Sequence, residues 1–397
     1  MPEWPDGPTQ KGLFMLRVCS QLTVLGVLFL SAPLALADVA ADIATIQKVD
    51  HAGVGHRAAT VALKELSQAP ATALPLLVKA IRGTNPLADN WLSGAFEAIA
   101  DRTLQAGGKL PAAELEVFVR DTQQDGNARR LAYEWLLKVD PTAADRLIPG
   151  MLRDPGSEFR RDAVQRLVTA AEAKLAAEEK DAAKAAFQEA LQGATDDDQV
   201  QAIVKPLKDL GVEVDLQQHF GFLTKWKLIG PFNNVDLVGF DTVYPPEREL
   251  KFDASYVGKD EMDVKWTEFA TTDEYGAVDL AKALAPHKGA VTYATTVFDA
   301  PKAQSAEIRL GTPNAWKLWV NGKLAFARDE YHRGSRLDQY KVKVELQPGR
   351  NVILMKVCQN EQKEEWAQDW RFQLRVCDSS GAALPPATAE VSALTDR

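Results

Sequence analysis

The sequence predicts a multidomain fold, α then β, in which an N-terminal α-helical repeat solenoid precedes a C-terminal β-sandwich jelly roll. Three observations support this fold class. Residues 38–215 are rich in Ala and Leu, with apolar residues spaced three and four apart as in helices. Residues 220–380 alternate short apolar runs with Gly, Pro and Asn turns, as strands do. The length of 397 residues exceeds what one core usually serves, so at least two domains are expected.

The first 37 residues have the order of a secretory signal peptide. Lys11 and Arg17 precede an apolar stretch over 22–30, and Ala35-Leu36-Ala37 supplies the small residues of a cleavage site. The alternative is a membrane anchor, but the apolar stretch is shorter than the roughly 18 to 20 residues that a spanning helix needs. We therefore expect export to the periplasm, the cell surface or the medium, with no membrane span after cleavage.

Nine helical segments are expected within residues 38–215. Turns that contain a capping oxygen or a proline separate them, as in Asp140-Pro141-Thr142 and Asp154-Pro155. The expected helices are 57–68, 71–82, 88–106, 112–121, 128–139, 143–153, 158–177, 182–192 and 197–210.

Part of this helical stretch resembles known repeat families. The residues that carry a resemblance to HEAT repeats are Arg129-Arg130, the turns Asp140-Pro141 and Asp154-Pro155, and Arg160-Arg161-Asp162. The segment 182–191, with Ala183, Ala186, Phe187 and Ala190, is instead similar to a tetratricopeptide (TPR) helix. The resemblance implies a stack of helix pairs with a long face for a protein partner. A plain helical bundle without a groove is the alternative that periodicity leaves open.

Ten strands are expected in residues 220–380. Asn321-Gly322 tolerates positive φ at both positions and predicts a type I′ hairpin turn. Pro348-Gly349 suits a type II turn. Residues 381–397 form an expected loose tail. The expected strands are 226–229, 264–269, 278–280, 291–298, 305–310, 315–320, 324–328, 340–346, 351–357 and 371–377.

Three runs of the β half match a known pattern: Leu318-Trp319-Val320-Asn321-Gly322-Lys323, Ile353-Leu354-Met355-Lys356-Val357 and Trp370-Arg371-Phe372-Gln373-Leu374-Arg375. They carry a resemblance to the galactose-binding-like jelly roll of carbohydrate-binding modules and of the sugar-binding domains of β-galactosidases and β-glucuronidases. It covers 225–378 and implies a domain that binds carbohydrate. The resemblance also implies that a structural Ca²⁺ is an open alternative, because such an ion is common in this fold family. No oxygen-rich motif demands one here, so no cofactor is expected.

A second resemblance is to a C-terminal module of exported proteins from polysaccharide-degrading bacteria. That module opens with Trp-x-x-x-Gly-Pro-Phe, here Trp226 and Gly230-Pro231-Phe232, and continues with Pro-Pro-Glu, here Pro245-Pro246-Glu247. The chain departs from the pattern at Thr312-Pro313-Asn314-Ala315, where Asp-Asp-Gly is usual. This departure puts an acidic ligand or ion contact at that turn in doubt.

Three tryptophans are candidates for stacking on a sugar ring, whose C–H face packs against an indole. Trp316, Leu318 and Val320 alternate toward the expected core, which leaves Trp319 on the opposite face. Trp366 and Trp370 flank the acidic stretch between the last two strands. The alternative for Trp319 is that a loop or the helical domain covers it.

The segment 328–338 supplies the other candidate ligand-binding residues. Arginine guanidinium groups bind carboxylates in bidentate fashion, and the loop also offers hydroxyl and carboxylate groups for sugar hydroxyls. A solvated loop of weak surface ion pairs is an equally good interpretation. The candidates in this loop are Arg328, Tyr331, His332, Arg333, Arg336 and Asp338.

Several function classes are excluded or disfavoured. The formal net charge of −9 argues against nucleic acid as a partner. No Gly-x-Ser-x-Gly, phosphate loop or dinucleotide fingerprint is present, so no catalytic residue is assigned. The sequence therefore predicts a non-catalytic exported protein that binds carbohydrate, a protein partner or both. The alternatives are a purely structural interaction protein and, below it, a glycoside hydrolase or lyase.

The two cysteines beyond the signal segment are Cys358 and Cys377. If the strands that end at them formed a simple antiparallel hairpin, the two residues would lie about six residues apart along the strands, at roughly 3.3 Å each. That distance excludes a disulfide unless the strand order is different.

Overall fold

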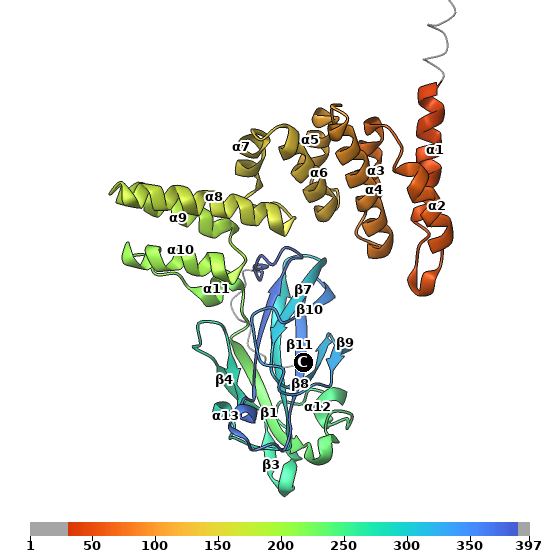
Figure 1. Ribbon diagram of the computed structural model, residues 1–397. Helices are drawn as coiled ribbons and strands as arrows, with labels where there is room; N and C mark the ends of the chain where they lie inside the picture. The colour runs from red at the N-terminus through yellow and green to blue at the C-terminus, as the bar shows by residue number, and fades with distance from the viewer. Residues whose placement is uncertain (1–30, 388–397) are drawn as a thin grey trace, which may run out of the picture. The chain divides into compact units, whose positions relative to one another are not determined.

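The computed structural model describes residues 31–387, with side chains from residue 38 onward (Figure 1). Helices come first and antiparallel sheets second, as predicted. The first 30 residues of the expected signal peptide and most of the expected tail lie outside the described residues. Helix α1 (Ser31–Ile46) runs across the expected cleavage position. Within residues 31–387, no helix combines the length and the apolar composition needed to cross a membrane.

The chain divides into two compact units, of which the first ends at Leu147 and the second begins at Ile148. In the first unit consecutive helices pack in pairs, α1 on α2, α3 on α4 and α5 on α6. Asp125 starts α6 by accepting hydrogen bonds from the N–H groups of Asn127 and Ala128. The helices after α1 are α2 (His56–Leu66), α3 (Leu74–Ala80), α4 (Pro86–Gln105), α5 (Ala112–Arg120), α6 (Gly126–Val139) and α7 (Ala143–Leu147).

The second unit contains the remaining long helices and all of the described strands. Its helices are α8 (Ser157–Ala176), α9 (Lys180–Gly193), α10 (Asp197–Asp209) and α11 (Leu216–Phe220). Their apolar core, which includes Phe187 and Ile203, extends to Phe222 and Tyr275 among the strands. The change from helices to strands thus falls near residue 220 as expected, whereas the two compact units meet at 147/148. Helix α11 is too short for its periodicity to predict.

All ten expected strands are present among the described residues, the expected strand 264–269 is divided into β3 and β4, and β2 is an addition. We call residues 225–377 the β region. Its strands are β1 (Lys225–Asn233), β2 (Ser255–Val257), β3 (Asp263–Lys265), β4 (Thr267–Ala270), β5 (Val278–Asp279), β6 (Ala290–Ala300), β7 (Gln304–Gly311), β8 (Ala315–Val320), β9 (Lys323–Arg328), β10 (Tyr340–Leu346), β11 (Gly349–Gln359) and β12 (Arg371–Cys377). Two single-turn helices also occur, α12 (Pro245–Arg248) and α13 (Leu280–Ala283).

The strands form two large antiparallel sheets. The six-stranded sheet has the order β4-β1-β6-β11-β8-β9, and the four-stranded sheet has the order β10-β7-β12-β5. A further pair, β2 and β3, stands apart. The β8–β9 hairpin closes through Asn321 and Gly322, whose φ angles of 51° and 76° confirm the type I′ prediction. Gly349 also has a positive φ, 76°, as its predicted turn requires.

The two large sheets share one apolar core. Trp316, Leu318 and Val320 point into it from β8, as the alternation predicts. Trp226 of the six-stranded sheet packs edge-to-face against Phe372 of the four-stranded sheet, with the ring centroids 4.9 Å apart. The last two strands do not form a hairpin, because β11 lies in the six-stranded sheet and β12 in the four-stranded one. The distance argument made for a hairpin therefore does not apply, yet Cys358 and Cys377 are both free and buried.

Candidate functional site

Loops from several strands meet at one end of the β region. Asn234, just after β1, donates to the carbonyl of Gln359 at the end of β11. The N–H of His332, in the β9–β10 loop, donates to the carbonyl of Pro313 in the β7–β8 loop. Asn314 reaches the carbonyl of Asp369 before β12. We call the loops 234–241, 285–289, 312–314, 329–339 and 360–370 the loop end.

Trp366 is the exposed aromatic residue of this loop end. It lies on a short 3₁₀ helix, Glu365–Ala367, and 62% of its surface is accessible. The ring of His332 packs against the indole at 4.9 Å with the planes nearly perpendicular. Residues 332 and 366 lie in different loops and are distant in sequence, so the structure brings two of the predicted candidates together. The contact holds the indole in place while most of the side chain stays accessible.

Tyr331 forms part of the floor beneath this pair. Its hydroxyl accepts a hydrogen bond of 3.1 Å from Asn234, and its ring packs against the apolar cluster that contains Phe232 and Leu354. Burial raises the pKa of the Tyr331 hydroxyl, so it stays protonated at neutral pH. Tyr331 therefore positions the loop, and its hydroxyl is already engaged.

Arg328 and Arg333 share one carboxylate. Glu330 accepts from Arg328 at 2.8 Å and from Arg333 at 3.1 Å. All three side chains are partly or largely exposed, so the pairs contribute little stability individually. These ion pairs fit the alternative interpretation of this loop, a solvated loop of weak surface ion pairs.

Two of the three candidate tryptophans do not present a face to solvent. Trp319 is 9% exposed, because Phe240 and residues of the segment 244–266 pack over the outer face of the six-stranded sheet. Trp370 is 1% exposed and lies in the core between the sheets, with its indole N–H aimed at the carbonyl of Val357. The loop cover that was the alternative for Trp319 is therefore present. Stacking on a sugar ring requires an open indole face, which Trp366 alone of the three offers.

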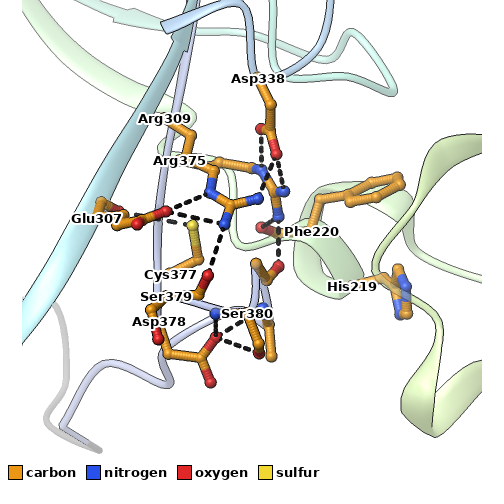
Figure 2. A network of polar contacts seen from close by, with 12 residues as sticks. His219, Phe220, Glu307, Arg309, Asp338, Arg375, Cys377, Asp378, Ser379 and Ser380 are labelled. Atoms are coloured by element: carbon orange, nitrogen blue, oxygen red, sulfur yellow. Dashed lines mark hydrogen bonds and ion pairs between the residues drawn. The ribbon is translucent and has the colours of Figure 1, made fainter. Parts of the chain in front are cut away.

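Asp338 is a structural anchor at the base of the β9–β10 loop (Figure 2). It accepts from Arg375 at 2.7 and 2.5 Å and from Arg309 at 2.7 Å. Arg309 also donates to Glu307, and Arg375 donates to the carbonyls of Phe220 and Gly381. We call Glu307, Arg309, Asp338 and Arg375 the ionic cluster. Both oxygens of Asp338, which is one of the predicted ligand-binding residues, therefore already accept hydrogen bonds within the cluster.

The pKa of Asp338 is consistent with a structural ion pair. Burial alone raises its pKa, but the hydrogen bonds and charges of Arg375 and Arg309 outweigh burial and hold the pKa below its ordinary value. A general acid needs the opposite shift. The carboxylate is therefore ionised at neutral pH and pairs two buried cations.

Sequence reasoning missed a second buried charge, Lys356, in the apolar run of β11. Its side chain is 0% exposed and donates to Glu247 at 2.8 Å and to the carbonyls of Phe240 and Thr242. The hydroxyl of Tyr293 donates to the same carboxylate. These bonds fasten the segment 234–248 over the six-stranded sheet and over Trp319. A lysine among five apolar neighbours was the available signal, because a lone charge in a buried strand requires a partner.

Several carboxylates of the β region, which a glycoside hydrolase could use in principle, are paired with basic side chains. Glu247 pairs with Lys356, Glu330 with two arginines and Asp338 with the ionic cluster. Glu268 is exposed beside Lys227 on the edge strand β4. Across residues 31–387, no three His, Cys, Asp or Glu side chains are grouped as ligands for a metal ion.

No protein-family model and no curated protein matches the sequence. Among solved structures, a family 35 carbohydrate-binding module from Clostridium thermocellum is 19% identical, over 22% of this chain and 71% of its own, with a TM-score of 0.17. A β-glucosidase from Kluyveromyces marxianus is 12% identical over 39% and 16% of the two chains, with a TM-score of 0.24. A β-glucuronidase from Faecalibacterium prausnitzii is 16% identical over 34% and 20%, with a TM-score of 0.21. These likenesses are local, so the ligand is inferred below from the residues of this chain.

Proposed function

We propose that the chain is an exported, non-catalytic carbohydrate-binding protein of the periplasm or cell surface. In this proposal the β region is a jelly-roll sandwich that binds glycan at its loop end. The helices form HEAT-like repeats that hold a protein partner. The protein would thus act as a scaffold at the cell surface, and it would require no cofactor.

The observation that carries the proposal is the open indole of Trp366. An exposed tryptophan braced by His332 offers a flat apolar surface, and a sugar ring covers such a surface with its C–H groups. Arg333 and Glu330 on the adjoining loop supply charged donors and acceptors for hydroxyl groups. The floor beneath them is fixed by Tyr331 and Asn234, so little ordering is needed on binding.

The absence of catalysis is part of the proposal. Acid–base cleavage of a glycosidic bond needs two carboxyl groups about 5 to 10 Å apart with different pKa values. Asp338 has its pKa lowered and Glu247 is bound to a buried lysine. Neither is poised to give a proton to a leaving group.

Affinity gel electrophoresis of the full chain on a panel of soluble polysaccharides tests the proposal. We expect retardation on at least one polysaccharide and its loss in Trp366→Ala. Leu324→Ala is the matched control, since Leu324 is also exposed but lies on β9 away from the loop end. Free migration of the folded wild-type chain on every polysaccharide would contradict the proposal.

A purely structural interaction protein is the second candidate. The observation in its favour is that Arg375 of the β region bonds the carbonyl of Phe220 at the end of α11, and that α8–α11 share a core with Phe222 and Tyr275. The β region would then serve as a buttress for the helices. Capture of one protein partner by a chain that no polysaccharide retards would favour this candidate.

A further inference from the structure

A polar hollow of about 280 Å³ lies in the second unit, apart from Trp366. Four segments line it: the start of α10, the β4–β5 connection, the β9–β10 loop and the start of β12. Its volume is close to the lower limit of small-molecule sites. The side chains that the inference uses are Asp197, Asp273, Tyr275, Arg336, Arg371 and Gln373.

One wall of the hollow carries unused donors. Arg336 is exposed, and within residues 31–387 no carboxylate pairs with it. Arg371 pairs with Asp369 through one terminal nitrogen at 3.0 Å, while its Nε is buried without a hydrogen-bond partner. The amide of Gln373 also has no hydrogen-bond partner among the described residues. Guanidinium groups whose N–H donors are not all used can bind a carboxylate in bidentate geometry.

The facing wall carries acceptors. Asp197 accepts from the hydroxyl of Tyr275 at 2.5 Å, and Asp273 accepts from the N–H groups of Tyr275 and Ala277 at 2.9 and 3.1 Å. These bonds use one oxygen of each carboxylate, and the other oxygen has no hydrogen bond within the described part of the chain. Burial and Asp197 raise the pKa of Tyr275 to about 12, so its hydroxyl remains a donor at neutral pH. The free oxygens can accept from hydroxyl groups.

The cationic wall is held in place before any ligand arrives. Asp338 of the ionic cluster fixes the loop two residues after Arg336, and Leu337 packs against the helical core. A side chain at position 311 would collide with the carbonyl oxygen of Arg336, so Gly311 permits the close approach of this loop to β7. The backbone at Arg336 is thus fixed in place, which lowers part of the entropic cost of binding.

We propose that this hollow binds a hydroxylated carboxylic acid, such as a sugar acid. The carboxylate lies against Arg336 and Arg371, and the hydroxyl groups donate to Asp197 and Asp273. The inference rests on the proposed function in assigning a sugar-like ligand to the β region. It uses a different set of residues, so the two can fail separately.

Isothermal titration calorimetry of the full chain with D-glucuronate, D-glucose, acetate and glycine tests the inference. We expect glucuronate to bind, with affinity that falls as salt is added. We expect Arg336→Gln to weaken it at least tenfold, Gln373→Leu to weaken it less, and glucose, acetate and glycine to bind more weakly than glucuronate. The matched control is Arg350→Gln, which removes an exposed arginine of β11 outside the hollow and should leave affinity unchanged.

Trp366→Ala separates this inference from the proposed function, because it should abolish polysaccharide retardation and leave glucuronate binding intact. A wild-type chain that does not bind glucuronate overturns the inference. Glucuronate binding that both Arg336→Gln and Gln373→Leu leave unchanged also overturns it. Glycine or acetate binding as tightly as glucuronate would overturn the assignment of the facing wall to hydroxyl groups.

Discussion

Two carboxylates of the β9–β10 loop each lie between two arginines but have different physical roles. We call Asp338 with Arg309 and Arg375 the base, and Glu330 with Arg328 and Arg333 the tip. At the base, Asp338 lies between Arg309 and Arg375, both nearly fully buried (Figure 2). At the tip, Glu330 lies between Arg328 and Arg333, all open to solvent to some degree. The same motif of one carboxylate between two arginines thus serves as an internal anchor in one place and as a wet rim in the other. Burial decides the role, because removing a partner from a buried pair leaves an uncompensated charge.

Asp338→Asn is the change with the largest expected effect on this comparison. It removes the negative charge that faces two buried guanidinium groups and should destabilise the chain by about 3 kcal/mol, the lower end of the range for a broken buried pair, because Arg309 keeps Glu307. Urea unfolding at pH 7 measures it. Glu330→Gln is the matched control at the tip, with an expected loss of about 0.5 kcal/mol. Equal losses in the two variants would contradict the distinction between base and tip.

Acid should weaken the base, where the pKa of Asp338 is lowered. An unfolded Asp titrates at about 3.9, and the folded pKa of Asp338 is lower, so the unfolded chain binds the proton first. The stabilisation by Asp338 is therefore complete above about pH 5 and disappears as pH falls through the folded pKa. The difference in unfolding free energy between wild type and Asp338→Asn should shrink from pH 7 to pH 3. A difference that stays constant over this range would show that charge is not its source.

Tyr331→Phe should have a smaller effect on stability, and it tests the hydrogen bond between Tyr331 and Asn234. The change deletes the hydroxyl that accepts from Asn234 at 3.1 Å, while Asn234 keeps its bond to the carbonyl of Gln359. We expect a loss of about 1 kcal/mol, typical of one hydrogen bond, in thermal or urea unfolding. A loss above about 3 kcal/mol would indicate that the ring has also shifted.

The elements of the fold were predictable from sequence because their signals are local. The Asn321-Gly322 turn and the alternation of Trp316, Leu318 and Val320 identify their strands without knowledge of the partners. The single-turn helices and α11 were not predicted, because four or five residues are too few to show a helical period of apolar residues. The expected helix over 143–153 divides into α7 and a 3₁₀ turn at Ile148–Met151, where Pro149 lies.

The role of each loop residue was not predictable, because it depends on pairings that are distant in sequence. Arg309 and Arg375 face each other across β7 and β12, and two facing cations require a shared anion. That anion is Asp338, which looks like any other residue of a polar loop. Likewise, the burial of Trp319 depends on a covering segment that Lys356 and Glu247 hold down.

Polysaccharide binding by the full chain and its Trp366→Ala variant tests the central claim most directly. The account predicts that the wild type is retarded on at least one polysaccharide, that Trp366→Ala migrates freely, and that its unfolding free energy stays within about 0.5 kcal/mol of wild type, as for an exposed site. Retardation that survives in Trp366→Ala would contradict the claim that the loop end binds carbohydrate through Trp366.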